Sequence, residues 1–266
     1  MRRRAKPASA YEERVPATAH DDGTDHRFQA TQHRYFAYAD DARFRWTTSA
    51  PGFADTEDAL LAPLLPLVEE PALEIGCGEG NNLVRLTRGG RWIGVDLHLP
   101  KVGFAARNVS RARFATADAS TLPFRAASFR TVFVRDLLHH LPDPAPVLAE
   151  AMRVLESGGR FLLLEPNAAN PIVLLQTYLV PAEALGRRSR PAHIESILHG
   201  LPLTRVDLQT VEPLPLRRLV LHYRFGLPRL GRVRPARAAL AAVEQLARRL
   251  LPPSRWAYVR VTAERT

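Results

Sequence analysis

The stretch LEIGCGEGNNL, Leu73 to Leu83, follows a short apolar run with three glycines at alternate positions. These glycines are Gly76, Gly78 and Gly80. A carboxylate, Glu74, stands two residues before the first glycine. A buried strand that runs into a glycine-rich turn is how an α/β sheet brings its backbone close to a nucleotide-like ligand. The stretch therefore predicts a ligand loop at the carboxyl end of a strand.

The surrounding sequence has the pattern of an α/β fold. Hydrophobic residues make up 46% of the 266 residues, which is enough to fill a core. From Pro71 onward, short apolar runs alternate with helix-length segments, as in a mostly parallel sheet with helices on both faces. We expect strands at PALEIG, RWIGVD, ARFATAD, TVFVRD and GRFLLLEP, with helices near residues 81–87, 101–109 and 144–155.

An acidic residue closes, or nearly closes, each expected strand. These residues are Glu74, Asp96, Asp118, Asp136 and Glu165. Ligands of such sheets bind at the carboxyl ends of the strands, near the point where the strand order reverses. The sequence therefore predicts a ligand site lined by carboxylates.

Carboxylates indicate which nucleotide-like molecule binds there. A dinucleotide loop has the spacing G-x-G-x-x-G, but Asn81 stands at the third glycine position, and Glu74 would repel a pyrophosphate. S-adenosylmethionine has no phosphate, and its sulfonium and ammonium groups are positive. We expect Asp96 to accept both ribose hydroxyls, Asp118 to accept from the adenine amino group, and Glu74 to lie under the methionine end.

The combined motifs resemble the class I S-adenosylmethionine-dependent methyltransferases. They are E-x-G-x-G-x-G, an acid closing the second strand, A-D-A-x-x-L-P-F, D-L-L-H-H-L-P-D and R-V-L-x-x-G-G-R-F, in this order between Ala72 and Asn167. The sequence is most similar to the subgroup that contains the quinone-biosynthesis, natural-product and lipid methyltransferases.

This resemblance implies a Rossmann-like doubly wound sheet of about seven strands, mostly parallel with an antiparallel last strand. It also implies an N-terminal helical lid and S-adenosylmethionine as cofactor. The cofactor contacts that it implies are Glu74, Gly76, Cys77, Gly78, Gly80, Asp96, Leu97, Asp118, Ala119 and Arg135, the last through its backbone.

Two adjacent histidines, His139 and His140, are the catalytic candidates. Methyl transfer is an in-line displacement with a neutral leaving group, so a base is needed only if the acceptor arrives protonated. His139 is the candidate base, whereas in the family a histidine at the position of His140 is typical of a site wall or of packing. We expect no metal, because adjacent histidines diverge and no carboxylate stands at helical spacing beside them.

Two outlying segments bear on the substrate. Residues 1–27 are expected to be a disordered tail, 28–70 a lid with substrate helices, and 71–266 the methyltransferase domain. Tyr35 and Trp46 are the candidate substrate contacts, and the alternative is an ordinary amphipathic helix. Between LTRVDLQTV and SRWAYVRVTAE, the two expected last strands, lies an insertion at about 213–254 that is too long for a plain turn.

Charge is concentrated in the last hundred residues. The chain has 37 Lys and Arg against 27 Asp and Glu, and the whole excess of +10 follows residue 166. Seven arginines within the insertion suit either an anionic membrane surface or a solvated cover on the sheet edge. They are Arg217, Arg218, Arg224, Arg229, Arg232, Arg234 and Arg237.

We therefore expect transfer of a methyl group to an oxygen, nitrogen or carbon of a small, apolar or lipid-like acceptor. The alternatives are an rRNA or tRNA methyltransferase that uses the basic segment, and a non-catalytic S-adenosylmethionine-binding protein. The first is disfavoured because RDLLHH replaces the D/N-P-P-Y/F motif of amino-base methylation. No apolar stretch has the length of a membrane span or the form of a signal peptide, so a cytoplasmic location is expected.

Overall fold

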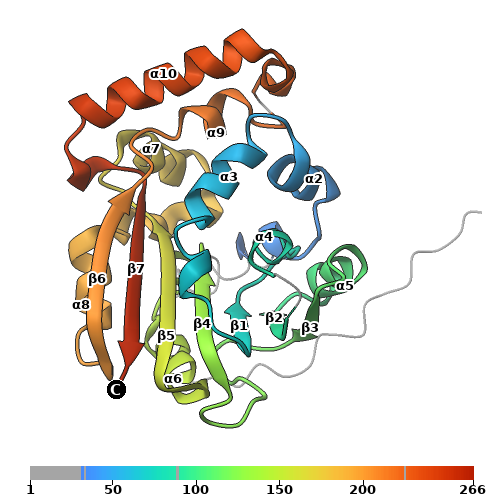
Figure 1. The fold of residues 1–266 in the computed structure, drawn as a ribbon, viewed down its shortest axis with the longest axis vertical. Coiled ribbons are helices and arrows are strands. Elements are labelled where there is room, and N and C mark those ends of the chain that lie inside the picture. The colour runs from blue at the N-terminus through green and yellow to red at the C-terminus, as the bar shows by residue number, and fades with distance from the viewer. Residues whose placement is uncertain (1–30, 33, 88–89, 225) are drawn as a thin grey trace, which may run out of the picture.

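The computed structural model describes residues 31–32, 34–87, 90–224 and 226–266, so the expected tail at 1–27 lies outside the described residues. Its centre is a seven-stranded sheet of order β3-β2-β1-β4-β5-β7-β6. The strands are β1 (Ala72–Ile75), β2 (Trp92–Asp96), β3 (Ala112–Thr116), β4 (Phe129–Arg135), β5 (Leu155–Pro166), β6 (Leu203–Val211) and β7 (Tyr258–Arg265). Only β7 runs against its neighbours, β5 and β6 (Figure 1). The predicted fold class is confirmed.

Helices connect and cover the strands. They are α2 (Asp41–Ser49), α3 (Ala54–Leu61), α4 (Leu83–Leu86), α5 (Leu99–Asn108), α6 (Ala145–Val154), α7 (Pro171–Leu179), α8 (Pro191–Leu198), α9 (Leu216–Val220) and α10 (Arg234–Leu250). Short 3₁₀ helices are η1 (Leu65–Leu67), η2 (Leu138–His140), η3 (Pro181–Arg188), η4 (Pro228–Arg232) and η5 (Pro253–Arg255). Within the described residues, no helix has the length and apolar character needed to cross a membrane.

The hydrophobic core has two parts, one on each face of the sheet. Along β4, Val132 and Val134 belong to the part that α6 and α8 cover, whereas Phe133 belongs to the part that α3 and α4 cover. These three side chains have no exposed surface. A continuous apolar run is therefore required at this central parallel strand, because its side chains are buried on both sides.

The order of the strands reverses between β1 and β4, which lie side by side although β2 and β3 separate them in sequence. The connections from both strands leave at the same, carboxyl edge of the sheet. This edge is where an open α/β sheet binds its ligand.

The predicted insertion follows β6 and contains α9, η4, α10 and η5. It packs on the N-terminal helices over the carboxyl edge of the parallel strands (Figure 1). The Trp46 indole N–H donates to the carbonyl oxygen of Leu221 at 2.7 Å, and its ring stacks on Phe53 with 3.7 Å between centroids. Arg218 of α9 forms an ion pair with Glu57 of α3 at 2.5 Å. The two outlying segments thus form one cover.

Candidate active site

The glycine loop follows β1 and turns in the left-handed backbone region. Gly76 has a φ angle of 77° and Gly78 has one of 52°, and residues with a side chain rarely adopt such positive values. A Cβ added to Gly76 would lie 3.1 Å from the Leu137 side chain, whereas one added to Gly78 would meet nothing within 4 Å. The backbone at Gly78 therefore faces open space, as a loop that receives a ligand must.

Asp96 closes β2 and is fixed against this loop. Its Oδ2 accepts from the Gly78 N–H at 2.9 Å, and its Oδ1 accepts from the His98 N–H at 2.9 Å. Burial tends to raise the pKa of Asp96, but His98, Lys101 and the backbone donors outweigh burial and lower the pKa. The carboxylate therefore stays ionised. Its Oδ1 also lies 3.3 Å from His98 Nδ1, whereas Oδ2 accepts from the Gly78 N–H and retains a lone pair that can accept a ribose hydroxyl.

Glu74 is fully buried in β1, next to the same loop. Its Oε1 accepts from the Asn82 side-chain amide at 2.6 Å, but its Oε2 has no hydrogen-bond partner among the described residues. Burial raises the pKa of Glu74 to about 8. A buried carboxylate oxygen without a partner is costly, and a bound cation would remove that cost. The positive methionine end of S-adenosylmethionine fits this position.

Arg135 ends β4, and its side chain is buried rather than directed to solvent. Its guanidinium donates to the Glu57 carboxylate at 2.8 Å, to the side-chain Oδ1 of Asn82 at 2.8 Å and to the Asp136 carboxylate at 3.1 Å. Burial opposes its charge, but Glu57 and Asp136 outweigh burial and raise the pKa of Arg135. The side chain is therefore a structural cation, and the expected backbone contact with the cofactor stays a prediction.

The remaining predicted contacts lie at the carboxyl edge with different exposure. Leu97 is 57% exposed, whereas Cys77 is buried, and burial raises the pKa of its thiol. Asp118 is exposed, and its Oδ1 accepts from the Ser120 N–H at 2.8 Å. Ala119 packs against the core. The loops after β1, β2 and β3 thus carry these residues to one edge of the sheet.

His139 is held between two carboxylates. Its Nδ1 lies 2.6 Å from Glu165 Oε2, and its Nε2 lies 3.2 Å from Glu183 Oε2. Burial disfavours the imidazolium, but the two glutamates outweigh burial and raise the pKa of His139 to about 10. This geometry does not favour the predicted role as a general base, because both ring nitrogens are engaged and the ring is already protonated at neutral pH.

His140 contributes to the wall of the site. Its ring lies edge-on to Phe36 with 4.7 Å between centroids, and its Nδ1 lies 3.4 Å from the Gln32 amide nitrogen. Burial and the charge of His139 lower the pKa of His140 to about 3. His140 is therefore neutral, in line with the wall or packing role that its position suggested.

The two aromatic substrate candidates lie apart from each other. Tyr35 is 54% exposed and touches Phe36 edge-on, while Trp46 is committed to packing against Phe53 and the insertion. Phe36 is the aromatic residue that reaches the site, because it contacts His140 and lies 4.9 Å from the Lys101 ammonium. Trp46 thus corresponds more closely to the alternative of an aromatic buried against the core.

Several site residues were not singled out from the sequence. Glu79, inside the glycine loop, is buried and accepts from the Asp40 N–H at 3.2 Å. Lys101, one of only two lysines in the chain, is buried near Asp96, and its rarity was an available signal. Glu183 gave no signal, because 44 residues separate it from His139.

Comparisons with known proteins agree with this geometry. Residues 73–163 match the family described as a methyltransferase domain. An uncharacterised methyltransferase of Mycobacterium tuberculosis is 31% identical over 159 residues, which cover 58% of this chain and 81% of that protein. The 27-O-demethylrifamycin SV methyltransferase of Amycolatopsis mediterranei is 34% identical over 117 residues, which cover 39% of this chain and 41% of that protein.

A solved structure shares the fold. The geranyl diphosphate C-methyltransferase of Streptomyces coelicolor A3(2), in complex with Mg²⁺, geranyl diphosphate and S-adenosyl-L-homocysteine, gives a TM-score of 0.56 at 16% identity. The match covers 80% of each chain. Several curated relatives are longer than the matched region, and the chain spans only 30% to 52% of their length.

The fold, the carboxylate-lined glycine loop and these relatives define the class of protein. The chain belongs to the S-adenosylmethionine-dependent methyltransferases, as the sequence motifs predicted. S-adenosylmethionine is the cofactor of this family.

Proposed function

We propose that the protein transfers the methyl group of S-adenosylmethionine to a small organic acceptor. The observation that carries this proposal is the buried Glu74 Oε2, which lacks a partner beside a glycine loop that faces open space. A cationic ligand would stabilise the ionised form of Glu74, whereas a pyrophosphate would disfavour that form.

The residues act by binding and orientation. Asp96 would hold the ribose of bound S-adenosylmethionine, and the ionised form of Glu74 would attract its positive methionine end. S-adenosylmethionine supplies the electrophilic methyl group, and its sulfur leaves as a neutral thioether. Placement of the reactants therefore supplies most of the acceleration.

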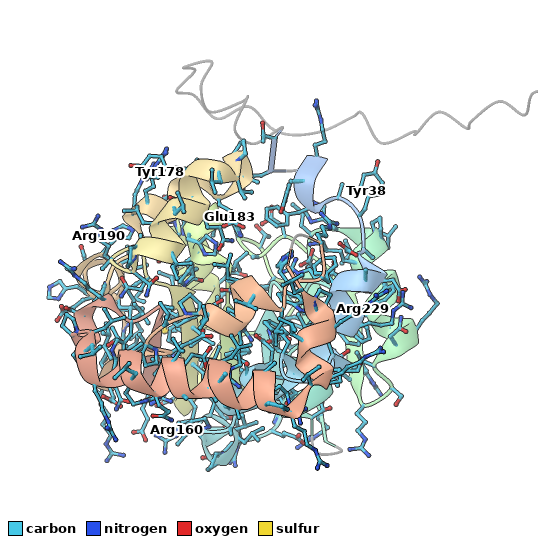
Figure 2. The ribbon with its side chains drawn as sticks, turned by 90° about the horizontal axis from the view of Figure 1, so that it is seen from above. Tyr38, Arg160, Tyr178, Glu183, Arg190 and Arg229 are labelled. Atoms are coloured by element: carbon cyan, nitrogen blue, oxygen red, sulfur yellow. The ribbon has the colours of Figure 1, made fainter. Side chains whose placement is uncertain are left out.

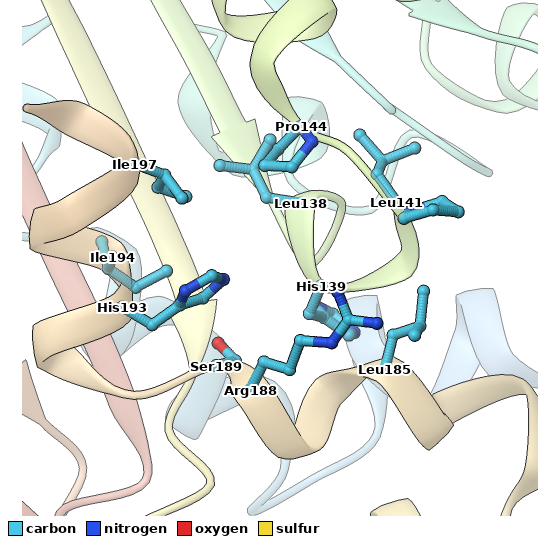
Figure 3. A pocket seen from close by; sticks show the side chains of 11 residues that line it. Leu138, His139, Leu141, Pro144, Leu185, Arg188, Ser189, His193, Ile194 and Ile197 are labelled. Atoms are coloured by element: carbon cyan, nitrogen blue, oxygen red, sulfur yellow. The ribbon is translucent and has the colours of Figure 1, made fainter. Parts of the chain in front are cut away.

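A small cavity lies beside His139. A cavity of about 40 Å³ lies between η2, η3 and α8, and the side chains of all three segments point into it (Figure 3). Its lining is mixed, because Leu138 and Ile194 lie beside His139, Arg188 and His193. The volume suits about one water molecule, so the cavity alone does not define the acceptor. The names of two similar proteins, which act on a rifamycin and on geranyl diphosphate, support an acceptor with a large apolar part.

The test is incubation with methyl-labelled S-adenosylmethionine and, in parallel, a small-molecule extract or total RNA. Label in an extracted small molecule supports the proposal. Label only in tRNA or rRNA would identify a nucleic-acid methyltransferase instead. Tight cofactor binding without label transfer to either pool would identify a non-catalytic binding protein.

We further propose that α10 contacts an anionic membrane surface while an apolar acceptor is collected. Val243, Leu246 and Leu250 are 46%, 54% and 71% exposed, and their spacing places them along one side of the helix. Figure 2, which views the molecule from above, shows α10 lying across the near face of the molecule. Apolar side chains with arginines beside them suit the headgroup boundary.

Three of the arginines that suggested a membrane contact form ion pairs with other parts of the molecule, although the Arg224 side chain is 62% exposed. Arg217 pairs with Glu244 at 2.7 Å, Arg218 with Glu212 at 3.0 Å, and Arg224 with Asp40. Their replacement would disturb the cover itself, so they are unsuitable for a binding test.

The membrane proposal is therefore tested with arginines of α10. Arg234→Gln with Arg249→Gln should reduce co-sedimentation with vesicles that contain anionic lipid, and salt should reduce it in the wild type. Arg111→Gln with Arg113→Gln, beside and within β3, is the control pair and should bind like the wild type. Equal binding to neutral and anionic vesicles, or none to either, would reject this contact.

A further inference from the structure

Two histidines and two glutamates from three separate segments meet beside the candidate active site. His139 and His140 belong to η2, Glu183 to η3, and Glu165 to the end of β5. One ligand atom each from His139, His140 and Glu183 can be chosen so that all three lie within 4.8 Å of one another. The expectation that adjacent histidines diverge does not hold here, because the two ring centroids are 3.9 Å apart.

A carboxylate also orients the first histidine from behind. Glu165 Oε2 lies 2.6 Å from His139 Nδ1, so the opposite nitrogen, Nε2, is turned toward Glu183. Glu165 is itself fixed, since its Oε1 accepts from the N–H groups of Leu137 and Leu138 at 2.9 Å. Histidines that bind metals usually have such a carboxylate on the nitrogen that does not face the metal.

The cluster therefore has three candidate ligands and an outer partner that fixes one of them. We propose that His139, His140 and Glu183 form a binding site for one divalent transition-metal cation, with Glu165 orienting His139. Two imidazoles and one carboxylate suit Zn²⁺ or Fe²⁺, whereas Mg²⁺ and Ca²⁺ prefer oxygen ligands alone.

The dimensions indicate what binding requires. Ligands about 2.1 Å from a tetrahedral metal are about 3.4 Å from one another, so a separation of 4.8 Å must shorten by more than about 1 Å. Glu183, labelled in Figure 2, lies on η3, while both histidines lie on η2. Movement of η3 toward η2 is therefore the adjustment that closes the site.

Metal binding displaces a proton from His139. Both nitrogens of His139 face carboxylates, so Nε2 carries a proton toward Glu183 in the metal-free cluster. The metal takes the place of that proton, which is released to solvent. Three protein ligands leave a coordination position for water or for an oxygen of another molecule.

The test uses untagged, full-length protein that has been treated with a chelator and dialysed. Titration with Zn²⁺ is followed by calorimetry, and titration with Co²⁺ by the visible spectrum. We expect one equivalent to bind, with release of about one proton, and Mg²⁺ to fail to compete. Glu183→Gln and His140→Ala should each lower the affinity at least about tenfold, while His199→Ala, at an exposed histidine after α8, should bind like the wild type.

Cofactor binding, measured by calorimetry on the same samples, reports whether each variant is folded. Glu183→Gln is nearly isosteric, so it keeps the test valid if His140→Ala does not fold. The proposal is overturned if the wild type binds no stoichiometric metal, or if folded Glu183→Gln binds it as tightly as the wild type. Because this readout needs no acceptor, it is independent of whether methyl transfer to a small molecule is observed.

Discussion

Glu57 of α3 faces two buried arginines, and its replacement by glutamine should destabilise the cover. Its carboxylate lies 2.8 Å from Arg135 of β4 and 2.5 Å from Arg218 of α9. Burial tends to raise the pKa of Glu57, but the two guanidinium groups outweigh burial and lower the pKa from 4.5 to about 2. A depression of the pKa from 4.5 to about 2 corresponds to roughly 3 kcal/mol of stability.

The removal of one partner from a buried ion pair costs a similar amount, about 3 to 5 kcal/mol. We therefore expect Glu57→Gln to lower the free energy of unfolding by about 3 kcal/mol at pH 7, as measured by urea denaturation. Because the folded-state pKa is depressed, the stabilisation is complete above pH 4.5 and is lost as the pH falls through 4.5 toward 2. The difference between wild type and variant should narrow over that range.

The matched control is Asp58→Asn, which removes the adjacent carboxylate of the same helix. Asp58 pairs with Arg85, but its side chain is 62% exposed, so its loss should cost less than about 1 kcal/mol. Equal destabilisation by the two variants at pH 7, or a difference from wild type that does not change with pH, would refute the reasoning.

Three further predictions concern the cofactor site and the cover. Asp96→Ala should weaken S-adenosylmethionine binding by about 2 to 3 kcal/mol, roughly thirtyfold to more than a hundredfold; unchanged affinity by calorimetry in a folded variant would remove Asp96 from the site. Since the pKa of Glu74 is about 8 and its ionised form attracts the sulfonium, cofactor affinity should rise with pH up to about 8. This rise should be absent in Glu74→Gln. Trp46→Phe keeps a ring on Phe53 but loses the donor to Leu221, so thermal or urea unfolding should show a loss of about 1 kcal/mol.

Much of the fold could be predicted because its signals are local. Apolar runs followed by acids predicted the five strands β1 to β5, and the family resemblance predicted β6, β7 and the antiparallel direction of the last strand. The start of β5 was less visible: the strand begins at Leu155, four residues before GRFLLLEP, because the segment with Gly158 at φ 76° extends as strand across a register shift against β4. Gly158 and Gly159 after a helix are typical of a helix end, but pairing with β4 makes this segment part of a strand.

The site was predictable only where a motif carried it. Gly78 and Asp96 lie 18 residues apart, yet each belongs to a motif at a strand end, so both were found. The surroundings of His139 depend instead on Glu165 and Glu183, which arrive from β5 and η3 and have no fixed spacing to the histidine. Because of these tertiary contacts, His139 is held between two carboxylates and is a poor general base. No periodic pattern in the sequence predicts such contacts.

Tertiary contacts also connect the insertion to the site, although the insertion is remote from the motifs in the sequence. Asn82 donates to Glu74 and accepts from Arg135, so one amide joins the cofactor-facing acid to the end of β4. Arg135 shares Glu57 with Arg218 of the insertion. A buried network of this kind tolerates few arrangements, because each charge that loses its partner is costly. The orientation of Asn82 at the cofactor loop therefore depends on charges that the insertion and α3 supply, and a segment that looks optional in the sequence is coupled to the most restrictive part of the fold.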